Sequence, residues 1–426
     1  MISFTKKLIL LLAEILTIPF FIISIVILKI TINKNNIPRL VWGPIPILNN
    51  SYWSKSMKIN GFNSFTYTYN YYQNINKRND WDIILDEKYL YFHSIFKPYI
   101  AFLDSMLKYD IFFIPFSGYF LGFTRIWFIE AFLFKLFNKK TVLLPYGSDA
   151  YVYNRTKSTT LNHALLLSYP NAGINQKKIQ RKVDYWIQHA DLIIAGIMGP
   201  DGLGRWDVLI PSILFIDLDL WKPSKKDTSN EYIKIVHTPN HKGFKGTEFI
   251  INAINELKNE GLNVELLLIE NKQNEEVRYI LENEADILIE QIVAPGHALS
   301  ALEGMSSGLP VISNLDDDQY LLAFRRWSYF SECPIVSANP ENIKLIIKKL
   351  VNDSELRNKL GLAGRKYVEK YHGLDSAHYL FKNCIDLIYY NKISKEKLLN
   401  LYHPLKNSFI NNNININNPL KNNKIV

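Results

Sequence analysis

The amino-acid sequence predicts two consecutive α/β domains, each built on a parallel β-sheet with helices on both faces. Three observations lead to this prediction. Short apolar runs typical of fully buried strands alternate with longer helical stretches. A polar segment at 221–230, which contains Pro223, interrupts the alternation, and the same pattern then restarts. The chain has 426 residues, which are too many for one ordinary hydrophobic core.

A hydrophobic segment precedes the first domain. Residues 8–28 are apolar except for three polar residues, Glu14 among them, and a run of this length is sufficient to span a bilayer. An ionised Glu14 in hydrocarbon would cost about 2.5–3.5 kcal/mol, and Pro19 would kink the helix. We assign residues 1–37 to a membrane anchor. A transmembrane helix, a segment in the membrane interface and a buried core helix all stay open.

The first domain is expected to cover residues 38–225. A helix is expected at Ser51–Asn60, with Gly61 as its C-cap, because glycine accepts the left-handed conformation that often ends a helix. Apolar runs indicate strands at 40–43, 82–85, 110–116, 141–144 and 191–195.

The second domain is expected to cover residues 226–392. Its strands are expected at 232–237, 264–269, 287–289, 310–313 and 335–336. Its helices are expected at 245–260, 339–351 and 354–371. Residues 393–426 are rich in Asn and lack periodicity, which predicts a disordered tail.

The overall charge limits the classes of partner. A net charge of +9 favours anionic partners such as phosphorylated ligands or an acidic membrane surface. The chain has neither zinc-finger spacing nor a long Lys/Arg run, so nucleic acid is not expected. Its two cysteines, Cys333 and Cys384, do not form a disulfide framework and fit a reducing compartment such as the cytosol.

The stretch that begins at Gly296 carries the most specific chemistry. Gly296 allows a tight turn and a close approach of the backbone to a ligand. A helix is expected to start near His297, so the free N–H groups around Ala298 and Leu299 can hold an anion such as a diphosphate. Glu303 lies about two turns into this helix, on a face that can reach a ribose.

Residues 303–312 have the sequence E-G-M-S-S-G-L-P-V-I. This resembles the signature of the family 4, or "group 1", glycosyltransferases, which is roughly E-A-M-A-x-G-x-P-V-I. The resemblance implies the GT-B architecture, with two Rossmann-like lobes, a cleft between them and the nucleotide-sugar held mainly by the second lobe. It also implies that Glu303 contacts the ribose and that a last helix, near 376–390, crosses back to the first lobe.

A second match covers His237 to Thr247. Relatives have G-R-L-x-x-x-K-G after the first strand of the second lobe, and Lys245-Gly246 aligns with the final pair. The resemblance implies that Lys245, with Lys242 or His241 in place of the family arginine, holds the donor diphosphate beside His237. Two cations suit this role because they neutralise charge on the leaving group.

The sequence departs from the family pattern at two positions. Pro295 stands where the first glutamate of E-x7-E is expected, eight positions before Glu303. Asn240 stands where the family arginine is expected, five positions before Lys245. A lysine cannot replace the bidentate geometry of an arginine. These departures keep open a non-enzymatic binding or scaffold protein derived from the same fold.

Two positions in the first lobe are weaker candidates. Gly43 belongs to the first strand–helix loop, which in this fold approaches the donor phosphates or the acceptor. Asp149 ends a Tyr-Gly-Ser-Asp turn that resembles an H-G-x-D-like turn facing the cleft. It is a candidate catalytic contact to the acceptor or the transition state, and an Asx-turn cap is an equal alternative.

No metal or other cofactor is expected. The run 316–318 contains three aspartates, but its place after a strand of the second domain favours a solvated loop over a D-x-D metal motif. His237 and His241 lack the intervening glutamate of a zinc-binding helix, and Pro239 lies between them. The nucleotide-sugar counts as a co-substrate.

Together with the resemblance, these features predict a hexosyltransferase-like glycosyltransferase, and the resemblance implies that it retains the anomeric configuration. It would transfer a sugar from a UDP- or GDP-sugar to a glycan, polysaccharide or lipid-linked acceptor, with its lobes in the cytosol at a membrane. Three alternatives stay open: a sugar-nucleotide epimerase of the same fold, the non-enzymatic scaffold, and a membrane-anchored protein that binds phosphorylated lipid without transfer.

Overall fold

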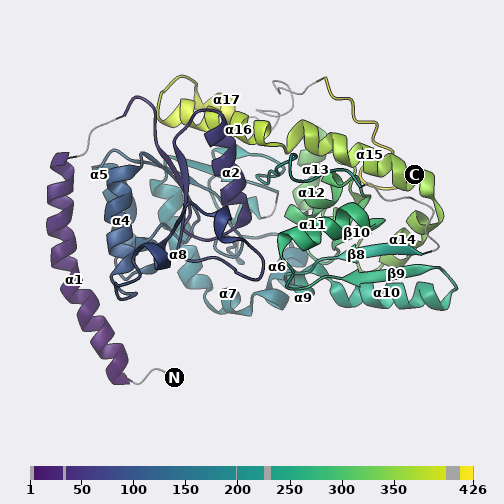
Figure 1. Ribbon diagram of the computed structural model, residues 1–426, viewed down its shortest axis with the longest axis horizontal. Helices are drawn as coiled ribbons and strands as arrows, with labels where there is room; N and C mark the ends of the chain where they lie inside the picture. The colour runs from purple at the N-terminus through teal and green to yellow at the C-terminus, as the bar shows by residue number, and fades with distance from the viewer. Residues whose placement is uncertain (1–3, 32–34, 198, 225–231, 400–412, 426) are drawn as a thin grey trace.

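The computed structural model describes residues 4–31, 35–197, 199–224, 232–399 and 413–425. Two α/β lobes lie side by side, and a long N-terminal helix runs along the outer edge of the first lobe (Figure 1). Both sheets are wholly parallel, as the strand–helix alternation predicts.

Lobe one has a seven-stranded sheet in the order β3-β2-β1-β4-β5-β6-β7. Its strands are β1 Leu40–Trp42, β2 Ser64–Thr68, β3 Ile83–Ile84, β4 Ile111–Ile114, β5 Lys140–Leu143, β6 Leu192–Ala195 and β7 Val208–Leu209. Its helices are α2 Leu48–Ile59, α3 Leu85–Lys88, α4 Lys97–Lys108, α5 Glu130–Leu136, α6 Thr159–Ser168, α7 Pro170–Ile174 and α8 Gln176–His189. The central strands β1, β4, β5 and β6 have the apolar, fully buried character that marks them in the sequence.

Lobe two has a five-stranded sheet in the order β12-β11-β10-β8-β9. Its strands are β8 Ile233–His237, β9 Val264–Leu268, β10 Ile287–Gln291, β11 Val311–Ser313 and β12 Val336–Ser337. Its helices are α9 Lys242–Lys245, α10 Thr247–Asn259, α11 Asn274–Asn283, α12 Leu299–Ser306, α13 Asp318–Trp327, α14 Ile343–Asn352 and α15 Ser354–Tyr371. The helix predicted at 245–260 is interrupted by Gly246, whose φ of +77° ends α9 before α10 begins.

Helix α16 (Leu374–Ile388) follows lobe two in the sequence but packs on lobe one, as the crossing helix was expected to do (Figure 1). Its Phe381 ring lies 4.8 Å from Trp42 and 5.5 Å from Phe113, centroid to centroid, in edge-to-face geometry. Trp53 of α2 completes this aromatic cluster at 5.9 Å. The cluster fixes the end of the chain to the first lobe.

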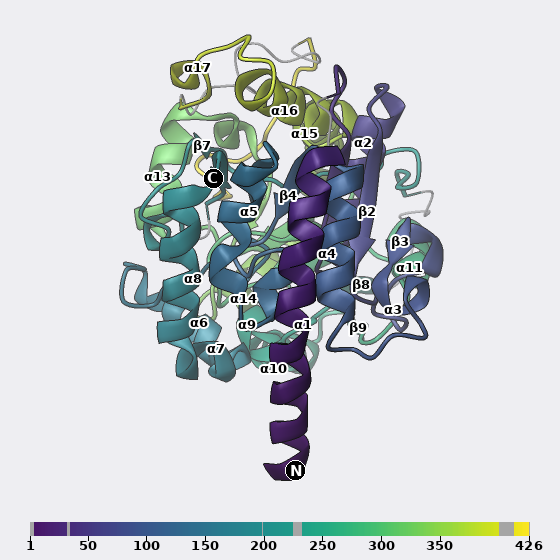
Figure 2. The same ribbon diagram turned by 90° about the vertical axis from the view of Figure 1, so that its left-hand side faces the viewer.

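Helix α1 (Phe4–Thr31) lies alongside α4 (Figure 2). Its Phe21 and Ile25 are buried against lobe one. The Glu14 carboxylate forms an ion pair with Arg125 at 2.9 Å and accepts a hydrogen bond from the Tyr99 hydroxyl at 2.9 Å. Glu14, which the sequence marks as costly in hydrocarbon, thus has polar partners on the protein.

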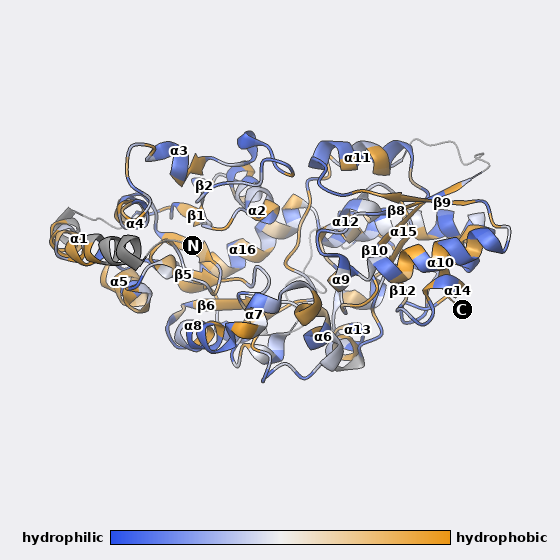
Figure 3. Ribbon diagram, turned by 90° about the horizontal axis from the view of Figure 1, so that it is seen from below, coloured by the Kyte–Doolittle hydropathy of each residue, from blue (hydrophilic) through white to orange (hydrophobic). Residues whose placement is uncertain are grey.

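The transmembrane interpretation of this segment finds no support in the structure. Among the residues that the structure describes, no helix combines the length and apolar character needed to cross a membrane. The described face of α1 that points away from lobe one is nevertheless apolar (Figure 3). Its exposed side chains are Leu12, Ile15, Leu16, Phe20, Ile22, Ile23, Val26 and Ile27.

The prediction of a disordered tail over 393–426 is wrong for two segments. Residues 395–399 form the short helix α17 (Lys395–Leu399) beside α16. Residues 413–425 lie against lobe two, where the buried Asn423 side chain donates to the carbonyls of Cys333 and Ile335 at 2.9 and 3.1 Å. Asparagine amides satisfy backbone groups here, so the composition that suggested disorder supplies side-chain hydrogen bonds to the β12 edge instead. Residues 400–412 lie outside the described part of the chain.

Removal of the Phe381 ring should destabilise the protein strongly. We expect Phe381→Ala to lower the free energy of unfolding by about 3–5 kcal/mol, because it leaves a cavity among three buried aromatic rings. Denaturant unfolding of the full chain measures this effect. Leu362→Ala, at a position on α15 that is 67% exposed, is the control and should change stability little. A loss below about 1 kcal/mol for Phe381→Ala would contradict the proposed role of this helix in joining the lobes.

Candidate functional site

The carboxyl ends of the two parallel sheets face each other across a cavity of about 230 Å³. Ligands of open parallel sheets bind at this edge, where the strand–helix loops meet. Lobe one supplies Pro145, Tyr146, Gly147, Ser148, Tyr151, Leu165, Tyr169, Gly196, Ile197, Pro211, Ser212, Ile213 and Leu214. Lobe two supplies Asn240, Phe244, Lys245, Gln291, His297 and Ala298. We call this space the cleft cavity.

Lys245 is the cation of the cleft cavity. It is the last residue of the one-turn helix α9, which ends at Gly246. A Cβ atom at Gly246 would lie 2.6 Å from the Ile292 side chain, so only glycine allows α9 to pack this closely against the segment after β10. This packing explains why glycine follows the lysine. Burial lowers the pKa of Lys245.

Glu290 is the partner of Lys245. The two buried side chains form a direct ion pair at the end of β10. The Glu290 carboxylate also accepts hydrogen bonds from the Ala298 backbone N–H at 3.3 Å, the Ser300 hydroxyl at 3.2 Å and the Ser313 hydroxyl at 3.1 Å. At the N-terminus of α12, which the sequence predicts as a diphosphate site, a carboxylate from within the protein therefore accepts one backbone N–H, that of Ala298.

His297 occupies the turn that leads into α12. Its side chain is buried, with 5% of the residue exposed, and it lines the cleft cavity. Neither ring nitrogen has a well-oriented hydrogen-bond partner. Burial lowers its pKa to about 4, although the nearby Ala298 backbone opposes this shift, so the ring is neutral at pH 7. A neutral imidazole offers one donor and one acceptor to a ligand.

Gly296 places this turn. Its φ of +97° lies in the region that favours glycine. Its N–H donates to the Asn314 carbonyl at 2.8 Å, and its own carbonyl accepts from the Ser313 hydroxyl at 2.7 Å. These contacts hold the turn against the end of β11, and Leu299 then begins α12.

Glu303 lies on α12, is buried, and is not among the residues that line the cleft cavity. Its carboxylate accepts a hydrogen bond from the Asn274 amide at 3.0 Å. Burial raises its pKa to about 7, while Asn274 and the positive charge of Lys245 act in the opposite direction. A carboxyl group with few partners near the cleft suits the recognition of ligand hydroxyls.

The structure gives internal partners to two other predicted ligand-binding residues. The His237 ring is fully buried, with one nitrogen 2.8 Å from the Ile289 carbonyl and the other 2.9 Å from the Thr247 hydroxyl. His237 therefore has no nitrogen left for a substrate and serves to join β8, β10 and α10. Lys242 is largely exposed and pairs with Glu270 at 3.1 Å, outside the lining of the cleft cavity.

The two candidates in lobe one, Asp149 and Gly43, also have structural roles within that lobe. Asp149 accepts the backbone N–H groups of Phe116 at 2.9 Å and Tyr146 at 3.1 Å, as the turn-cap alternative expects. Burial raises its pKa to about 7. At Gly43 a Cβ atom would lie 2.0 Å from the Tyr67 carbonyl oxygen, so close backbone packing inside lobe one requires this glycine.

Sequence analysis missed Glu290, Asn274 and Ser148. Glu290 could have been predicted from the sequence, because a carboxylate at the end of an apolar strand is buried and needs polar partners. Asn274 lies on α11, and nothing in its local sequence indicates that it contacts α12. Ser148 was visible only as part of the turn that ends at Asp149.

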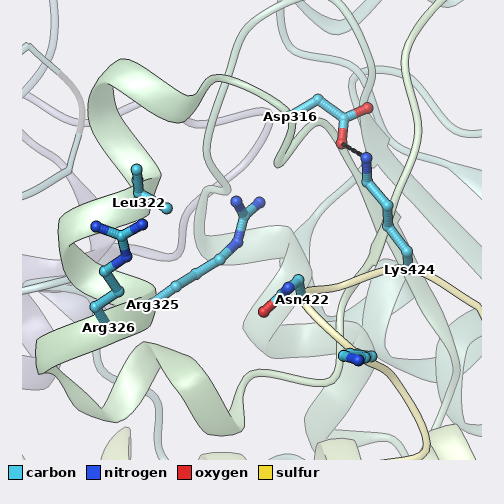
Figure 4. A pocket seen from close by; sticks show the side chains of 7 residues that line it. Asp316, Leu322, Arg325, Arg326, Asn422 and Lys424 are labelled. Atoms are coloured by element: carbon cyan, nitrogen blue, oxygen red, sulfur yellow. Dashed lines mark ion pairs between the residues drawn. The ribbon is translucent and has the colours of Figure 1, made fainter.

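A second cavity, of about 560 Å³, lies between α13 and the C-terminal segment (Figure 4). It is lined by Asp316, Leu322, Arg325, Arg326, Lys421, Asn422 and Lys424. The Arg325 guanidinium donates to the Leu315 carbonyl and to the Asn423 amide oxygen, and Lys424 lies 3.9 Å from Asp316. Arg326, Lys421 and Lys424 are exposed, so this basic surface is distinct from the buried Lys245.

Asp316 and Asp317, the first two aspartates of the 316–318 run, have partners within the protein. Asp316 accepts from the hydroxyl of Ser337 at 2.7 Å, and Asp317 accepts from the hydroxyl of Ser158 in lobe one. Among the side chains that the structure describes, no group of His, Cys, Asp or Glu is arranged to hold a metal ion.

Comparisons with known proteins identify the fold. No protein-family model matches the chain, and no curated protein sequence matches it. Sucrose-phosphate synthase from Thermosynechococcus elongatus superposes with a TM-score of 0.53 at 13% identity, over 84% of this chain and 100% of that chain. This likeness shows that the chain has the GT-B fold, as the sequence resemblance implies.

Two further solved structures are similar at lower scores. HepE from Anabaena, solved in complex with UDP and glucose, gives a TM-score of 0.49 at 10% identity, over 83% of this chain and 100% of that chain. A glycosyltransferase from Rickettsia africae gives a TM-score of 0.47 at 14% identity, over 84% of this chain and 100% of that chain.

The raised pKa of Glu303 predicts a pH-dependent stability. The folded state holds the proton up to about pH 7, whereas an ordinary glutamate releases it near 4.5, so the folded state binds more protons between these values. Stability should therefore fall as the pH rises through this window. We expect wild type to lose roughly 1–3 kcal/mol relative to Glu303→Gln between about pH 5 and pH 8.

Thermal or denaturant unfolding of both proteins across this pH range measures the difference. Glu341→Gln, at an exposed position, is the control and should follow wild type. Parallel pH profiles for wild type and Glu303→Gln would show that the Glu303 carboxyl is not perturbed.

Proposed function

We propose that this protein is a glycosyltransferase that moves a sugar from a nucleotide-sugar donor to an acceptor held by lobe one. The observation that carries the proposal is the placement of Lys245 and the N-terminus of α12 in the lining of the cleft cavity, with Glu303 farther along the same helix. These groups offer a hydroxyl acceptor, a cation and a helix dipole, which match a ribose and a diphosphate. The shared GT-B fold supports the same assignment.

The nucleotide is proposed to be UDP or GDP. The Glu303 carboxyl group would accept hydrogen bonds from the ribose hydroxyls, with Asn274 orienting it at 3.0 Å. Lys245 and the N-terminus of α12 would bind the diphosphate. His297 and Ser148, which line the cleft cavity from opposite lobes, would contact the transferred sugar or the acceptor hydroxyl.

The chemistry is proposed to rest on stabilisation of the leaving group. As the bond from the sugar to the diphosphate breaks, negative charge develops on the phosphate oxygens. Lys245 and the dipole of α12 are already placed to stabilise this charge, so little reorganisation is needed at that moment. Retention of anomeric configuration follows from the family resemblance, and no step requires a metal ion. Asp149 keeps a positioning role in this scheme, because it holds the ends of β4 and β5 together.

The acceptor is proposed to be a glycan, a polysaccharide or a lipid-linked sugar at a membrane surface, with the lobes in the cytosol. The exposed apolar face of α1 supports this proposal, since contiguous apolar patches of this kind mark membrane or protein contacts. An apolar groove of about 630 Å³ between α1 and α4 continues this face. The helix would then lie in the interface rather than span the membrane.

A binding or scaffold protein without transfer activity is the second candidate. Three observations favour it. Glu290 fills the anion position at α12, and Asn240 and Pro295 replace the charged residues that relatives carry. Nucleotide binding without turnover would support this alternative.

Nucleotide binding is the first test. We expect UDP or GDP to raise the melting temperature of the full chain, since a ligand at about 100 times its Kd adds about 2.7 kcal/mol. Glu303→Ala should abolish the shift, whereas Glu341→Ala should retain it. EDTA should leave the shift unchanged, because the proposed site uses no metal. If no nucleotide stabilises the well-folded protein, the transferase proposal fails and the scaffold becomes the better explanation.

Membrane association is the second test. We expect the protein to sediment with vesicles that contain anionic lipid, because α1 is apolar and the net charge is +9. The double variant Leu16→Ser/Phe20→Ser should weaken this binding several-fold. Leu345→Ser, at an exposed leucine on α14, is the matched control and should not change it. Equal sedimentation of the three proteins would exclude α1 as the contact surface.

A further inference from the structure

The proposed diphosphate site is occupied by the protein's own carboxylate. The Glu290 carboxylate forms an ion pair with the Lys245 ammonium group and accepts a hydrogen bond from the Ala298 backbone N–H at the start of α12. It also accepts hydrogen bonds from the hydroxyls of Ser300 and Ser313. Helix N-terminal N–H groups, hydroxyls and cations are also the donors that proteins use to bind phosphate. The donor set around Glu290 is therefore suited to a phosphate as well as to a carboxylate.

The charges around the cleft cavity are balanced from within. Among the described residues that line it, Lys245 is the one lysine or arginine, and it forms an ion pair with Glu290. Lys242 is paired with Glu270 farther out, and His297 is neutral at pH 7. A diphosphate that entered the cavity would find no uncompensated positive charge unless the Lys245–Glu290 pair opened.

A separate observation indicates that the cavity receives a ligand. His297 is buried beside the N-terminus of α12, and neither of its ring nitrogens has a well-oriented partner. Unpaired buried polar atoms are costly, typically about 1–3 kcal/mol each, and buried polar groups in native proteins are usually hydrogen-bonded to protein or to ordered water. The imidazole therefore supplies a recognition group for a ligand that reaches α12.

We propose that Glu290 determines the affinity of this site for nucleoside diphosphates, because its carboxylate competes with the ligand's phosphate for Lys245 and the N-terminus of α12. In the free protein Glu290 holds these donors in place. When the diphosphate binds, Lys245 exchanges the Glu290 carboxylate for a phosphate oxygen. When the diphosphate leaves, the ion pair between Lys245 and Glu290 forms again. The inference rests on the proposed function and gives the buried Lys245, whose pKa burial lowers, an anionic partner while the site is empty.

If Glu290 competes with the phosphate, a substitution that removes its charge should raise the affinity of the site for phosphate ligands. Glu290→Gln keeps the shape and the carbonyl acceptor of the side chain but removes its charge. Lys245 then has no anionic partner in the free protein, and a phosphate becomes its best partner. Inorganic pyrophosphate is a suitable probe, because it presents the diphosphate group without the nucleoside or the sugar.

We expect isothermal titration of the full chain to give a pyrophosphate Kd at least tenfold lower for Glu290→Gln than for wild type, which is about 1.4 kcal/mol. Lys245→Met in the Glu290→Gln background should abolish this gain. The double variant Lys421→Ala/Lys424→Ala, in the basic cavity of Figure 4, is the control for surface binding and should leave the gain intact.

Glu290→Asp covers the case in which the glutamine variant does not fold. The shorter side chain keeps its charge but draws the carboxylate away from Lys245 and α12, so its pyrophosphate Kd should lie below that of wild type. An unchanged or higher Kd in a folded Glu290→Gln or Glu290→Asp protein overturns the inference.

The outcomes separate this inference from the proposed function. If UDP or GDP stabilises wild type and neither Glu290 variant binds pyrophosphate more tightly, only the inference fails. If no nucleotide or pyrophosphate binds wild type or the variants, both fail. If pyrophosphate binds the variants alone, Glu290 closes the site in the natural protein and the inference holds.

Discussion

The relative position of the two lobes depends on the packing of α16 against the aromatic residues of lobe one. Each sheet by itself collects its loops at one edge, because every strand is parallel to its neighbours. The return of the chain through Phe381 to Trp42 and Phe113 helps to hold these two edges toward each other. Direct contacts between the lobes, such as the hydrogen bonds from Ser158 to Asp317 and from Tyr320 to Asp201, act with it on either side of the cleft cavity.

Most of the fold could be predicted because buried parallel strands appear in the sequence as short, continuous apolar runs. The runs at 111–114 and 192–195 are apolar on both faces, and α15 begins and ends where its periodicity indicates. Strand β2 escaped because serine and threonine alternate with aromatic residues in Ser64–Thr68, a pattern that does not resemble a fully buried strand. The ordered C-terminal segment was not predicted because its asparagines form specific side-chain hydrogen bonds, which the composition of the segment does not reveal.

The candidate site was predicted less completely, for a related reason. Glu303, Lys245 and His297 could be found because each belongs to a local motif with its own glycine or helix start. Local motifs do not state what a side chain pairs with. Lys245 meets Glu290 across 45 positions of the chain, and His237 is satisfied by Ile289 and Thr247. Pairing across strands decides whether a charge is available to a ligand, and only the three-dimensional structure supplies it.

The return of α16 also has a meaning for the order in which the protein is made. Lobe one is synthesised first, yet the helix that covers its aromatic residues lies beyond the whole of lobe two in the sequence. The emerging first lobe must therefore keep Trp42, Trp53 and Phe113 uncovered while the ribosome completes the second. Domains usually fold in the order of their synthesis, but here the earlier domain is completed by a helix that follows the later one. A nascent chain of this protein therefore carries an uncovered apolar surface on lobe one until α16 has been made.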